Sequence, residues 1–332
     1  MALILVTGGA GFIGSHVCEA LLARGDRVRV LDDLSTGRRE NLPPGVELVV
    51  GDVACAETVR AASRGVAAIV HLAAVASVQR CTEDWLGAHR VNLGGSIAVF
   101  DAARTAADGI PVPVVYASSA AVYGEQARLP IDEDAPCRPL SAYGADKLGS
   151  ELHARVAGAV HGVPTMGLRF FNVYGPRQDP RSPYSGVISV FCGRIARGEP
   201  ILIHGDGKQT RDFIFVADVV RGILAALDRA SVSAPVLNLC SGRATSVRGL
   251  ASTLLALADA SVPVCHGPSR AGEIRHSLGD PSRAEATLGL PPPTPLAEGL
   301  AAVLGWLGLK PQSPCRLRGC RLSALTCFQD RG

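Results

Sequence analysis

A tyrosine and a lysine lie four residues apart in the segment SAYGADK, residues 141–147. If this segment is helical, Tyr143 and Lys147 lie one turn apart on the same face of the helix. A tyrosine phenol has a pKa of about 10, so it is a poor base near neutrality. An ammonium about 4 Å away, at an effective dielectric of about 20, supplies the roughly 4 kcal/mol needed to lower that pKa to about 7. The pair predicts a tyrosine base, although Tyr-x-x-x-Lys alone is common by chance and often lies on a surface without function.

A serine is available to complete such a site. The segment SSAAVYG, residues 118–124, follows an apolar run that ends at Ala117. Ser119, Tyr143 and Lys147 could therefore converge in one site. A serine hydroxyl can hold a substrate oxygen and relay its proton. The three residues together suit the removal of a hydroxyl proton while hydride leaves the same carbon.

The segment TGGAGFIG, residues 7–14, stands between an apolar run and a helical pattern. Its glycines include Gly8, Gly11 and Gly14, which permit a tight turn and a close approach of the backbone to a pyrophosphate. The following helix would add unpaired N–H groups and the positive end of its dipole. The segment predicts a dinucleotide-binding turn; the alternative is a glycine-rich turn that binds nothing.

Two aspartates that end the next two apolar runs refine this prediction. A carboxylate at Asp32 would accept hydrogen bonds from ribose hydroxyls and repel a 2′-phosphate, which favours NAD over NADP. Arg38 and Arg39 could bind a 2′-phosphate and therefore weakly favour NADP, but they lie several residues after Asp32. Asp52 is placed to reach the adenine end of the bound dinucleotide. The alternative is that its carboxylate only closes the turn after the strand.

The elements that would position these residues alternate between strands and helices. Apolar runs typical of strands lie at 2–8, 26–33, 46–52, 67–74, 111–120 and 165–175, and helical patterns lie at 11–25, 55–64, 84–108 and 141–160. This alternation indicates a parallel sheet covered on both faces by helices. The predicted fold class is α/β, a doubly wound parallel sheet of the Rossmann type with a smaller α/β substrate-binding lobe. We expect the sheet domain at 1–168 plus about 212–240, the lobe at about 169–211 plus 241–309, and a flexible tail at 310–332.

Composition and charge argue against several other classes of protein. The chain has 332 residues, is 47% hydrophobic and carries a net charge of +3, so nothing demands a nucleic-acid partner. Its N-terminal apolar run is too short for a signal peptide, and no run approaches the roughly 18 apolar residues of a membrane span. The ten cysteines include no Cys-x-x-Cys, and the eight histidines lack metal-binding spacing. We expect a cytoplasmic protein with reduced thiols, no metal, and no membrane or nucleic-acid partner.

Taken together, the motifs resemble those of the extended short-chain dehydrogenase/reductase superfamily. Within it, the chain is most similar to the nucleotide-sugar epimerases of the UDP-glucose/UDP-N-acetylglucosamine 4-epimerase type. The resemblance rests on TGGAGFIG, HLAA at 71–74, SSAAVYG, YGADK and RFFNVYGPRQ, and it runs from about residue 2 to residue 309. It implies an enzyme that uses NAD, epimerises a UDP-sugar at C4 through a transient 4-keto sugar, and forms a homodimer.

The resemblance also implies a set of site residues. Catalysis is expected from Ser119, Tyr143 and Lys147. The residues expected to contact NAD are Gly8, Gly11, Phe12, Ile13, Gly14, Asp32, Asp33, Leu34, Ser35, Thr36, Gly37, Asp52, Val53, Leu72, Ala73, Ala74, Ala76, Asn92, Ser118, Tyr143 and Lys147. The residues expected to contact the substrate are Ser119, Asn172, Val187, Arg211, Arg270, Glu273 and Ser277. Arg211 and Arg270 resemble the arginines that clamp the diphosphate, although each could instead form an ion pair with a neighbouring acid.

Three positions indicate which member of the family this chain resembles. Related 4,6-dehydratases carry an Asp-Glu pair where this chain has Ala120 and Ala121, and UDP-glucuronate decarboxylases carry a glutamate nearby. Alanine can do no acid–base work, which argues against elimination and decarboxylation. Ser277 matches a position that gates the sugar site, where a tyrosine suits plain glucose and a small residue admits an N-acetyl group. We expect activity on UDP-GlcNAc/UDP-GalNAc, with UDP-Glc/UDP-Gal as further substrates.

Two alternatives remain open at the level of sequence. The first is a UDP-glucuronate 4-epimerase, in which Arg177, Arg181 and Arg275 would meet a sugar carboxylate. The second is a non-catalytic sensor or scaffold that binds NAD. A sensor would have no need for a serine, a tyrosine and a lysine in catalytic arrangement.

Overall fold

The larger part of the protein is a seven-stranded sheet in which all paired strands are parallel. The structure is a computed structural model that describes residues 1–180, 186–269 and 274–311. The strands lie in the order β10-β6-β5-β4-β1-β2-β3. They span β1 Leu3–Thr7, β2 Arg27–Asp32, β3 Glu47–Val50, β4 Ala68–His71, β5 Val114–Ser119, β6 Thr165–Phe170 and β10 Val236–Leu239. The order of strands reverses between β1 and β4, where ligands bind in doubly wound sheets.

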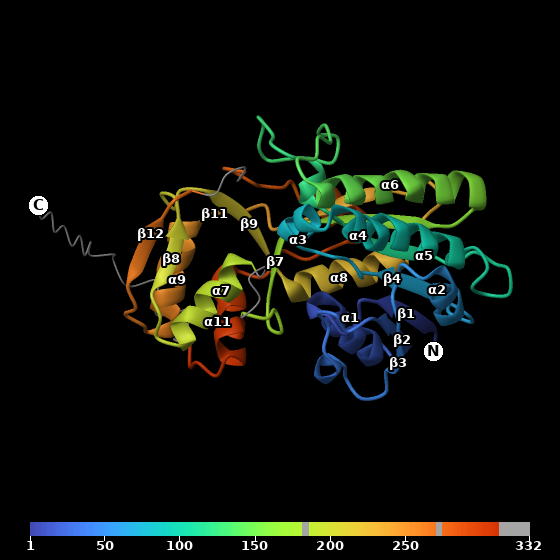
Figure 1. The fold of residues 1–332 in the computed structure, drawn as a ribbon, viewed down its shortest axis with the longest axis horizontal. Coiled ribbons are helices and arrows are strands. Elements are labelled where there is room, and N and C mark those ends of the chain that lie inside the picture. Colours follow the sequence, from blue (N-terminus) through green and yellow to red (C-terminus); the bar gives the residue numbers. More distant parts are fainter. Residues whose placement is uncertain (181–185, 270–273, 312–332) are drawn as a thin grey trace, which may run out of the picture.

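Helices cover both faces of this sheet, as Figure 1 shows. One face packs against α1 (Phe12–Ala23), α8 (Val216–Leu227) and α10 (Ser282–Leu288), and the other against α2 (Ala56–Ala62), α5 (Gly95–Ala103) and α6 (Ala142–His161). Neighbouring strand residues alternate between the two cores: Ile4 and Val6 belong to the first, and Leu5 belongs to the second. Because both faces are buried, the strands read as continuous apolar runs in the sequence. The predicted fold class is confirmed.

A smaller lobe lies beside the sheet domain (Figure 1). It contains a sheet in the order β11-β9-β7 and a separate parallel pair, β12-β8. Its strands are β7 Asn172–Tyr174, β8 Ile201–His204, β9 Thr210–Phe215, β11 Ala244–Ser246 and β12 Val264–Gly267; its helices are α7 Val187–Ala196, α9 Val247–Ala258 and α11 Leu296–Trp306. These helices share a core centred on Phe191, Leu250 and Leu300. The domain boundaries given above remain a prediction.

Two predicted elements are interrupted. The helix expected at 84–108 is instead α4 (Trp85–His89), a π-helical turn at Arg90–Gly94, and α5; α3 (Val78–Glu83) precedes it. The strand expected at 165–175 is divided between β6 and β7, which belong to different sheets. A periodic apolar pattern does not reveal such local breaks, because they depend on hydrogen bonds to distant segments.

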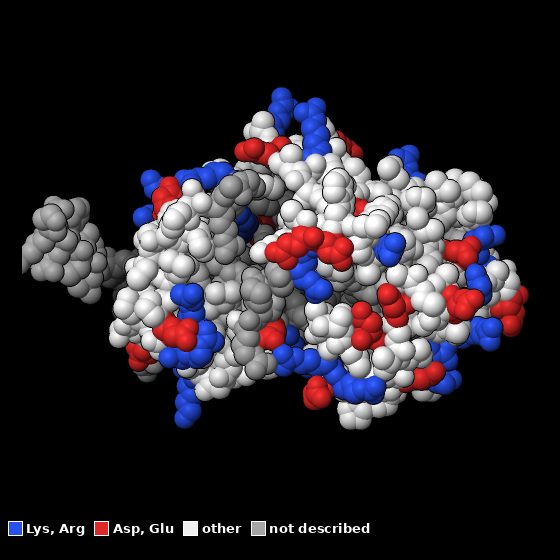
Figure 2. Space-filling view, in the orientation of Figure 1, with Lys and Arg blue, Asp and Glu red and all other residues white. Residues whose placement is uncertain are grey.

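No helix within the described residues is long and apolar enough to cross a membrane. Acidic and basic side chains are interspersed over the face of the molecule shown in Figure 2. Most of the predicted tail, residues 312–332, lies outside the described residues.

Candidate active site

A cavity of about 660 Å³ lies at the carboxyl ends of the sheet strands, where the strand order reverses. Its walls come from the glycine-rich turn, the ends of several sheet strands, and the start of α6. The predicted site residues that line it are Gly8, Gly11, Phe12, Ile13, Gly14, Asp32, Asp33, Ser35, Thr36, Gly37, Asp52, Val53, Leu72, Ala73, Ala74, Ala76, Ser118, Ser119, Tyr143, Lys147 and Asn172. Most of the predicted cofactor contacts and all three predicted catalytic residues therefore meet in one cavity.

Some predicted residues lie elsewhere. Leu34, Asn92, Val187, Arg211 and Ser277 are not among the residues that line the cavity. Asn92 supports the cavity wall from behind, because its Oδ1 accepts a hydrogen bond from the backbone N–H of Val75 at 2.8 Å. Two other predicted contacts, Arg270 and Glu273, lie outside the described residues.

The glycine-rich turn has the close packing that its sequence predicts. Gly8 has a left-handed backbone with φ 70°, and a Cβ there would lie 2.7 Å from the backbone nitrogen of Ala73. A Cβ on Gly14 would lie only 2.2 Å from the carbonyl oxygen of Gly8. No side chain caps the N-terminus of α1, which begins at Phe12 beside the cavity. The first N–H groups of α1 are therefore available to an anion, which fits the pyrophosphate of a dinucleotide.

Asp32 is held at the end of β2 with its carboxylate at the cavity wall. Oδ2 accepts a hydrogen bond from the N–H of Ala10 and Oδ1 from the N–H of Leu34, both at 2.9 Å. Burial raises the pKa of this carboxyl, and the two backbone hydrogen bonds oppose that rise. Arg38 forms an ion pair with Asp179 and does not line the cavity. This arrangement fits a ribose with free hydroxyls and would repel a 2′-phosphate.

The catalytic candidates are positioned mainly by α6. The side chain of Ser141 caps this helix by accepting a hydrogen bond from the N–H of Gly144, which puts Tyr143 in the first turn. Lys147 is only 3% exposed, and its Nζ donates a hydrogen bond to the carbonyl oxygen of Ala117 at 2.9 Å. Nζ lies 5.7 Å from the centre of the Tyr143 ring. The Ser119 hydroxyl faces the Tyr143 phenol and favours its charged form.

Burial changes the pKa values of Tyr143 and Lys147 in the chain alone. Burial raises the pKa of Tyr143 to about 12, and the Ser119 hydroxyl only partly opposes this rise. Burial also lowers the pKa of Lys147 to about 8. In the chain alone, Lys147 therefore does not bring the phenol to a pKa near 7, and its action together with the positive nicotinamide ring stays a prediction. The ammonium bonds the Ala117 carbonyl rather than the phenol, so desolvation of the phenol dominates.

Several cavity residues were not predicted. Arg80 reaches the cavity from α3, Gly87 and Ala88 from α4, and Asp84 from between them. The last three fall within the single helix expected at 84–108, which gave no reason to separate them from its other residues. Gln178 also lines the cavity, and its Oε1 accepts a hydrogen bond from Ser189 on α7 at 2.5 Å. The signal for Gln178 was present, because it ends the RFFNVYGPRQ motif.

Comparison with known proteins decides the family. Residues 4–240 match the family model described as "NAD dependent epimerase/dehydratase family". This chain belongs to that family. It is therefore an NAD-dependent enzyme, as Asp32 and the glycine-rich turn predicted, and the resemblance stated from the sequence is confirmed.

Several known proteins are similar to this chain over nearly the whole length of both chains. A putative UDP-glucose 4-epimerase of Methanocaldococcus jannaschii is 35% identical over 306 residues, which cover 92% of this chain and 98% of that protein. A crystal structure of UDP-glucose 4-epimerase with UDP-glucose from Thermotoga maritima is 33% identical, with a TM-score of 0.88 over 92% of this chain and 98% of that chain. A UDP-N-acetylglucosamine 4-epimerase from Methanobrevibacter ruminantium, in complex with UDP-N-acetylmuramic acid, is 32% identical, with a TM-score of 0.86 over 92% and 97% of the two chains.

Proposed function

We propose that this enzyme interconverts the C4 epimers of a UDP-sugar, with UDP-GlcNAc and UDP-GalNAc as the principal pair and UDP-Glc and UDP-Gal as further substrates. The observation that carries the proposal is the meeting of Ser119, Tyr143 and Lys147 in the cavity that also holds the glycine-rich turn. The names of the relatives support the reaction and the UDP-sugar class.

The chemistry assigns a role to each of the three residues. Bound NAD supplies an acceptor and donor for the hydrogen at C4. Tyr143 takes the proton of the C4 hydroxyl and later returns it, while Ser119 holds the same oxygen. Because the Tyr143 phenol has a pKa of about 12 in the unliganded chain, binding must lower that pKa before the phenol can act as a base. The Lys147 ammonium and the Ser119 hydroxyl favour the charged phenolate.

The 4-keto sugar must turn over between the two proton transfers, so its nucleotide needs a separate anchor. We propose that Asn172, Arg211 and Arg270 hold the diphosphate and that Glu273 holds the uridine ribose. Asn172 lines the cavity at the start of β7. Arg211 lies on β9 in the smaller lobe. Anchoring the nucleotide from the lobe would leave the sugar free to rotate against Tyr143.

The substrate preference predicts a specific result for Ser277→Tyr. Ser277 is half-buried, and its N–H donates a hydrogen bond to the carbonyl oxygen of Thr210. A tyrosine there would take the space of an N-acetyl group, so kcat/KM for UDP-GlcNAc should fall by about tenfold or more while that for UDP-Glc falls less. Ser252→Tyr, on an exposed position of α9, is the control. An unchanged ratio of the two kcat/KM values would reject the gate.

The UDP-glucuronate alternative has less support. Arg177 forms an ion pair with Glu19, Arg275 forms one with Asp206, and neither arginine lines the cavity. The third arginine, Arg181, lies outside the described residues. We propose no second function.

Proton NMR of the purified protein with UDP-GlcNAc and no added cofactor tests the proposal. The anomeric signals of UDP-GalNAc should grow to a constant ratio, because the NAD that catalyses the reaction is regenerated in each cycle. No change in protein shown to contain NAD would exclude the N-acetylated pair. The same assay with UDP-Glc and UDP-glucuronate then identifies the substrate, and inactivity with all three would favour a sensor.

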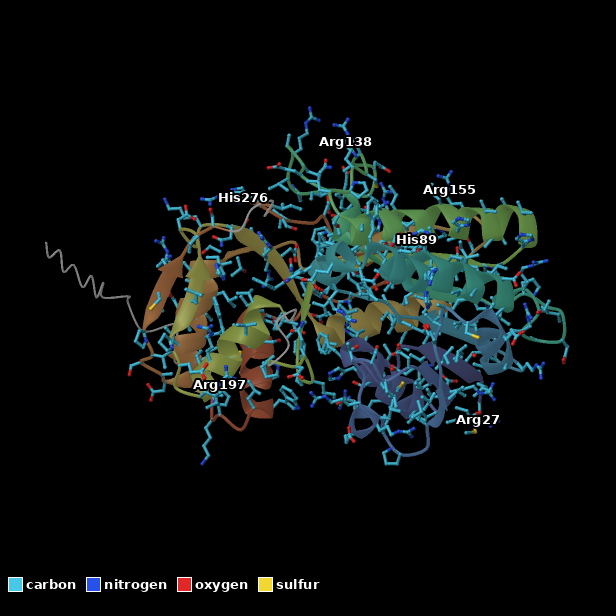
Figure 3. The ribbon with its side chains drawn as sticks, viewed as in Figure 1. Arg27, His89, Arg138, Arg155, Arg197 and His276 are labelled. Atoms are coloured by element: carbon cyan, nitrogen blue, oxygen red, sulfur yellow. The ribbon has the colours of Figure 1, made fainter. Side chains whose placement is uncertain are left out.

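We also propose that the protein is a homodimer joined through α4 and α6. Their outward side carries large apolar residues that are 49% to 71% exposed: Trp85, Leu86, Leu152, Val156 and Val160. Arg155 on α6 points away from the sheet in Figure 3 and marks this outer side. An apolar surface of this kind on two neighbouring helices suits a two-fold interface.

The seven cysteines within the described ranges are free thiols, which supports a cytoplasmic location.

The dimer proposal predicts that Val156→Asp yields a monomer. A carboxylate at this site would be desolvated in the interface at a cost of several kcal/mol, which exceeds what one apolar contact contributes. Sedimentation velocity should show the mass of one chain for the variant and of two for the wild type. The control, Ile110→Asp, changes a similarly exposed residue outside α4 and α6. A wild-type monomer at micromolar concentration would refute the proposal.

A further inference from the structure

A row of polar side chains crosses three neighbouring strands just beneath the catalytic serine. Ser118 on β5 pairs in register with Arg169 on β6, and Arg169 pairs with Asn238 on β10. All three residues are buried. The next row contains Ser119, which pairs with Phe170. Central strands of a parallel sheet are usually apolar, so this polar row needs an explanation.

The row is organised by a buried ion pair. The Arg169 guanidinium donates two parallel hydrogen bonds to Glu151 on α6, from Nε to Oε1 at 2.9 Å and from Nη2 to Oε2 at 2.7 Å. The two side chains are only 7% and 6% exposed. Ser118 donates to the same Oε1 at 2.5 Å. The Tyr123 hydroxyl accepts a hydrogen bond from Arg169 Nη1 at 2.8 Å and donates one to Asn238 Oδ1 at 2.7 Å.

Glu151 continues the face of α6 that carries the catalytic residues. Tyr143, Lys147 and Glu151 are spaced by four residues and therefore lie on one side of the helix. Each meets the end of β5: the Tyr143 phenol faces Ser119, Lys147 donates a hydrogen bond to the Ala117 carbonyl, and Glu151 accepts one from Ser118. Three turns of one helix are thus fixed against three consecutive residues of one strand. Loss of the third contact would leave the other two free to shift.

Stability does not explain the ion pair. Removing two charges from water costs several kcal/mol each, and replacing a buried pair with apolar residues of similar size is often neutral or stabilising. We propose that the Glu151–Arg169 pair, supported by Tyr123, positions β5 against α6 so that Ser119 and Tyr143 meet the same substrate oxygen. These are positioning residues that do not touch the substrate. Only the kinetic prediction of this proposal rests on the proposed function, because it needs turnover of a UDP-sugar.

The double variant Glu151→Met/Arg169→Leu tests this role. It should fold with an unfolding midpoint close to that of the wild type, because the removal of two buried charges offsets the hydrogen bonds that Ser118 and Tyr123 lose. Its kcat should fall by about tenfold to about hundredfold, because an ångström-scale misplacement of reacting groups has effects of that size. The KM for the UDP-sugar should change by less than about threefold, since the nucleotide is anchored elsewhere.

Arg29→Leu/Glu47→Met is a matched control. This arginine–glutamate pair of the same sheet, also with a hydrogen bond of 2.9 Å, joins β2 to β3 rather than a helix to a strand, is more exposed, and does not line the cavity. The control should keep the wild-type kcat. A stable Glu151→Met/Arg169→Leu variant with wild-type kcat would overturn the proposal. If the double variant does not fold, Tyr123→Phe removes one hydroxyl from the network and should lower kcat several-fold without changing KM.

A second readout does not depend on turnover. In protein labelled with ¹³Cζ-tyrosine, the Tyr143 signal is identified by its absence in Tyr143→Phe. The chain has five tyrosines, so the spectrum is simple. We expect the Tyr143 signal to shift in the double variant and to stay in place in the Arg29/Glu47 control, because only the double variant moves the Ser119 hydroxyl relative to the phenol. An unshifted signal would contradict the positioning role even if the wild type proved inactive on every UDP-sugar.

Discussion

Lys147→Met should remove nearly all activity and at the same time make the folded protein more stable. Lys147 carries a buried ammonium beside Tyr143, and without this charge the phenol cannot act as a base near neutrality. We expect kcat to fall by at least about hundredfold. The same charge is costly to the fold, because burial lowers the pKa of Lys147 from 10.5 to about 8, which corresponds to about 3 kcal/mol.

The stability gain should depend on pH in a defined direction. Below pH 8 both the folded and the unfolded chain hold the lysine proton, so the folded wild type bears the full cost of the buried charge. Between pH 8 and 10.5 only the unfolded chain holds it, so the wild-type free energy of unfolding rises with pH. At pH 7 the free energy of unfolding of Lys147→Met should exceed that of the wild type by about 2 kcal/mol, because the loss of the hydrogen bond to Ala117 removes about 1 kcal/mol of the gain. This difference should shrink above pH 8.

Denaturant unfolding of the NAD-free proteins from pH 7 to pH 10 measures this effect. Lys208→Met, on an exposed turn, serves as the control and should change neither kcat nor the pH dependence. A Lys147→Met protein that is less stable than the wild type at pH 7 would show that the ammonium is not buried at a net cost.

Gly14→Ala should abolish tight NAD binding. The added Cβ would lie 2.2 Å from the Gly8 carbonyl oxygen and 2.7 Å from the Gly9 Cα, and both are backbone atoms that cannot move aside cheaply. Relief requires α1 to move away from the glycine-rich turn, which separates the helix N-terminus from the pyrophosphate site. We expect NAD to bind at least about hundredfold more weakly, and the free energy of unfolding to fall by about 3 kcal/mol.

NAD content after gel filtration and calorimetric titration of the NAD-free protein measure the loss. Gly305→Ala on α11 is the matched control, because a Cβ there meets nothing within 4 Å. It should bind NAD normally and gain up to about 1 kcal/mol of stability from the better helix former. Normal retention of NAD by Gly14→Ala would mean that the turn does not hold the pyrophosphate.

The fold could be predicted from the sequence because its signals are local. Strands buried on both faces read as continuous apolar runs, and the turn at Gly8 needs a residue that tolerates a left-handed backbone. Asp32 could be assigned because a strand end fixes where its side chain lies. The convergence of Ser119 with Tyr143 was predicted from the chemistry that a serine, a tyrosine and a lysine can perform together.

The remaining features depend on contacts between distant residues. The π-helical turn between α4 and α5 accompanies two hydrogen bonds between Asn92 and Val75, one donated by each residue, that no periodicity reveals. The pKa of Tyr143 could not be predicted, because the sequence does not show that the lysine ammonium binds a strand carbonyl. The Glu151–Arg169 pair joins a helix to a strand across 18 residues. Only the folded chain brings these charges together.

Turnover of UDP-GlcNAc labelled with deuterium at C4, in ordinary water, tests the central claim most directly. If Ser119, Tyr143 and Lys147 catalyse removal and return of the same hydrogen, mass spectrometry and NMR should find the deuterium still on C4 of the UDP-GalNAc formed. Loss of the label to solvent, or a product inverted at a carbon other than C4, would contradict the proposed reaction.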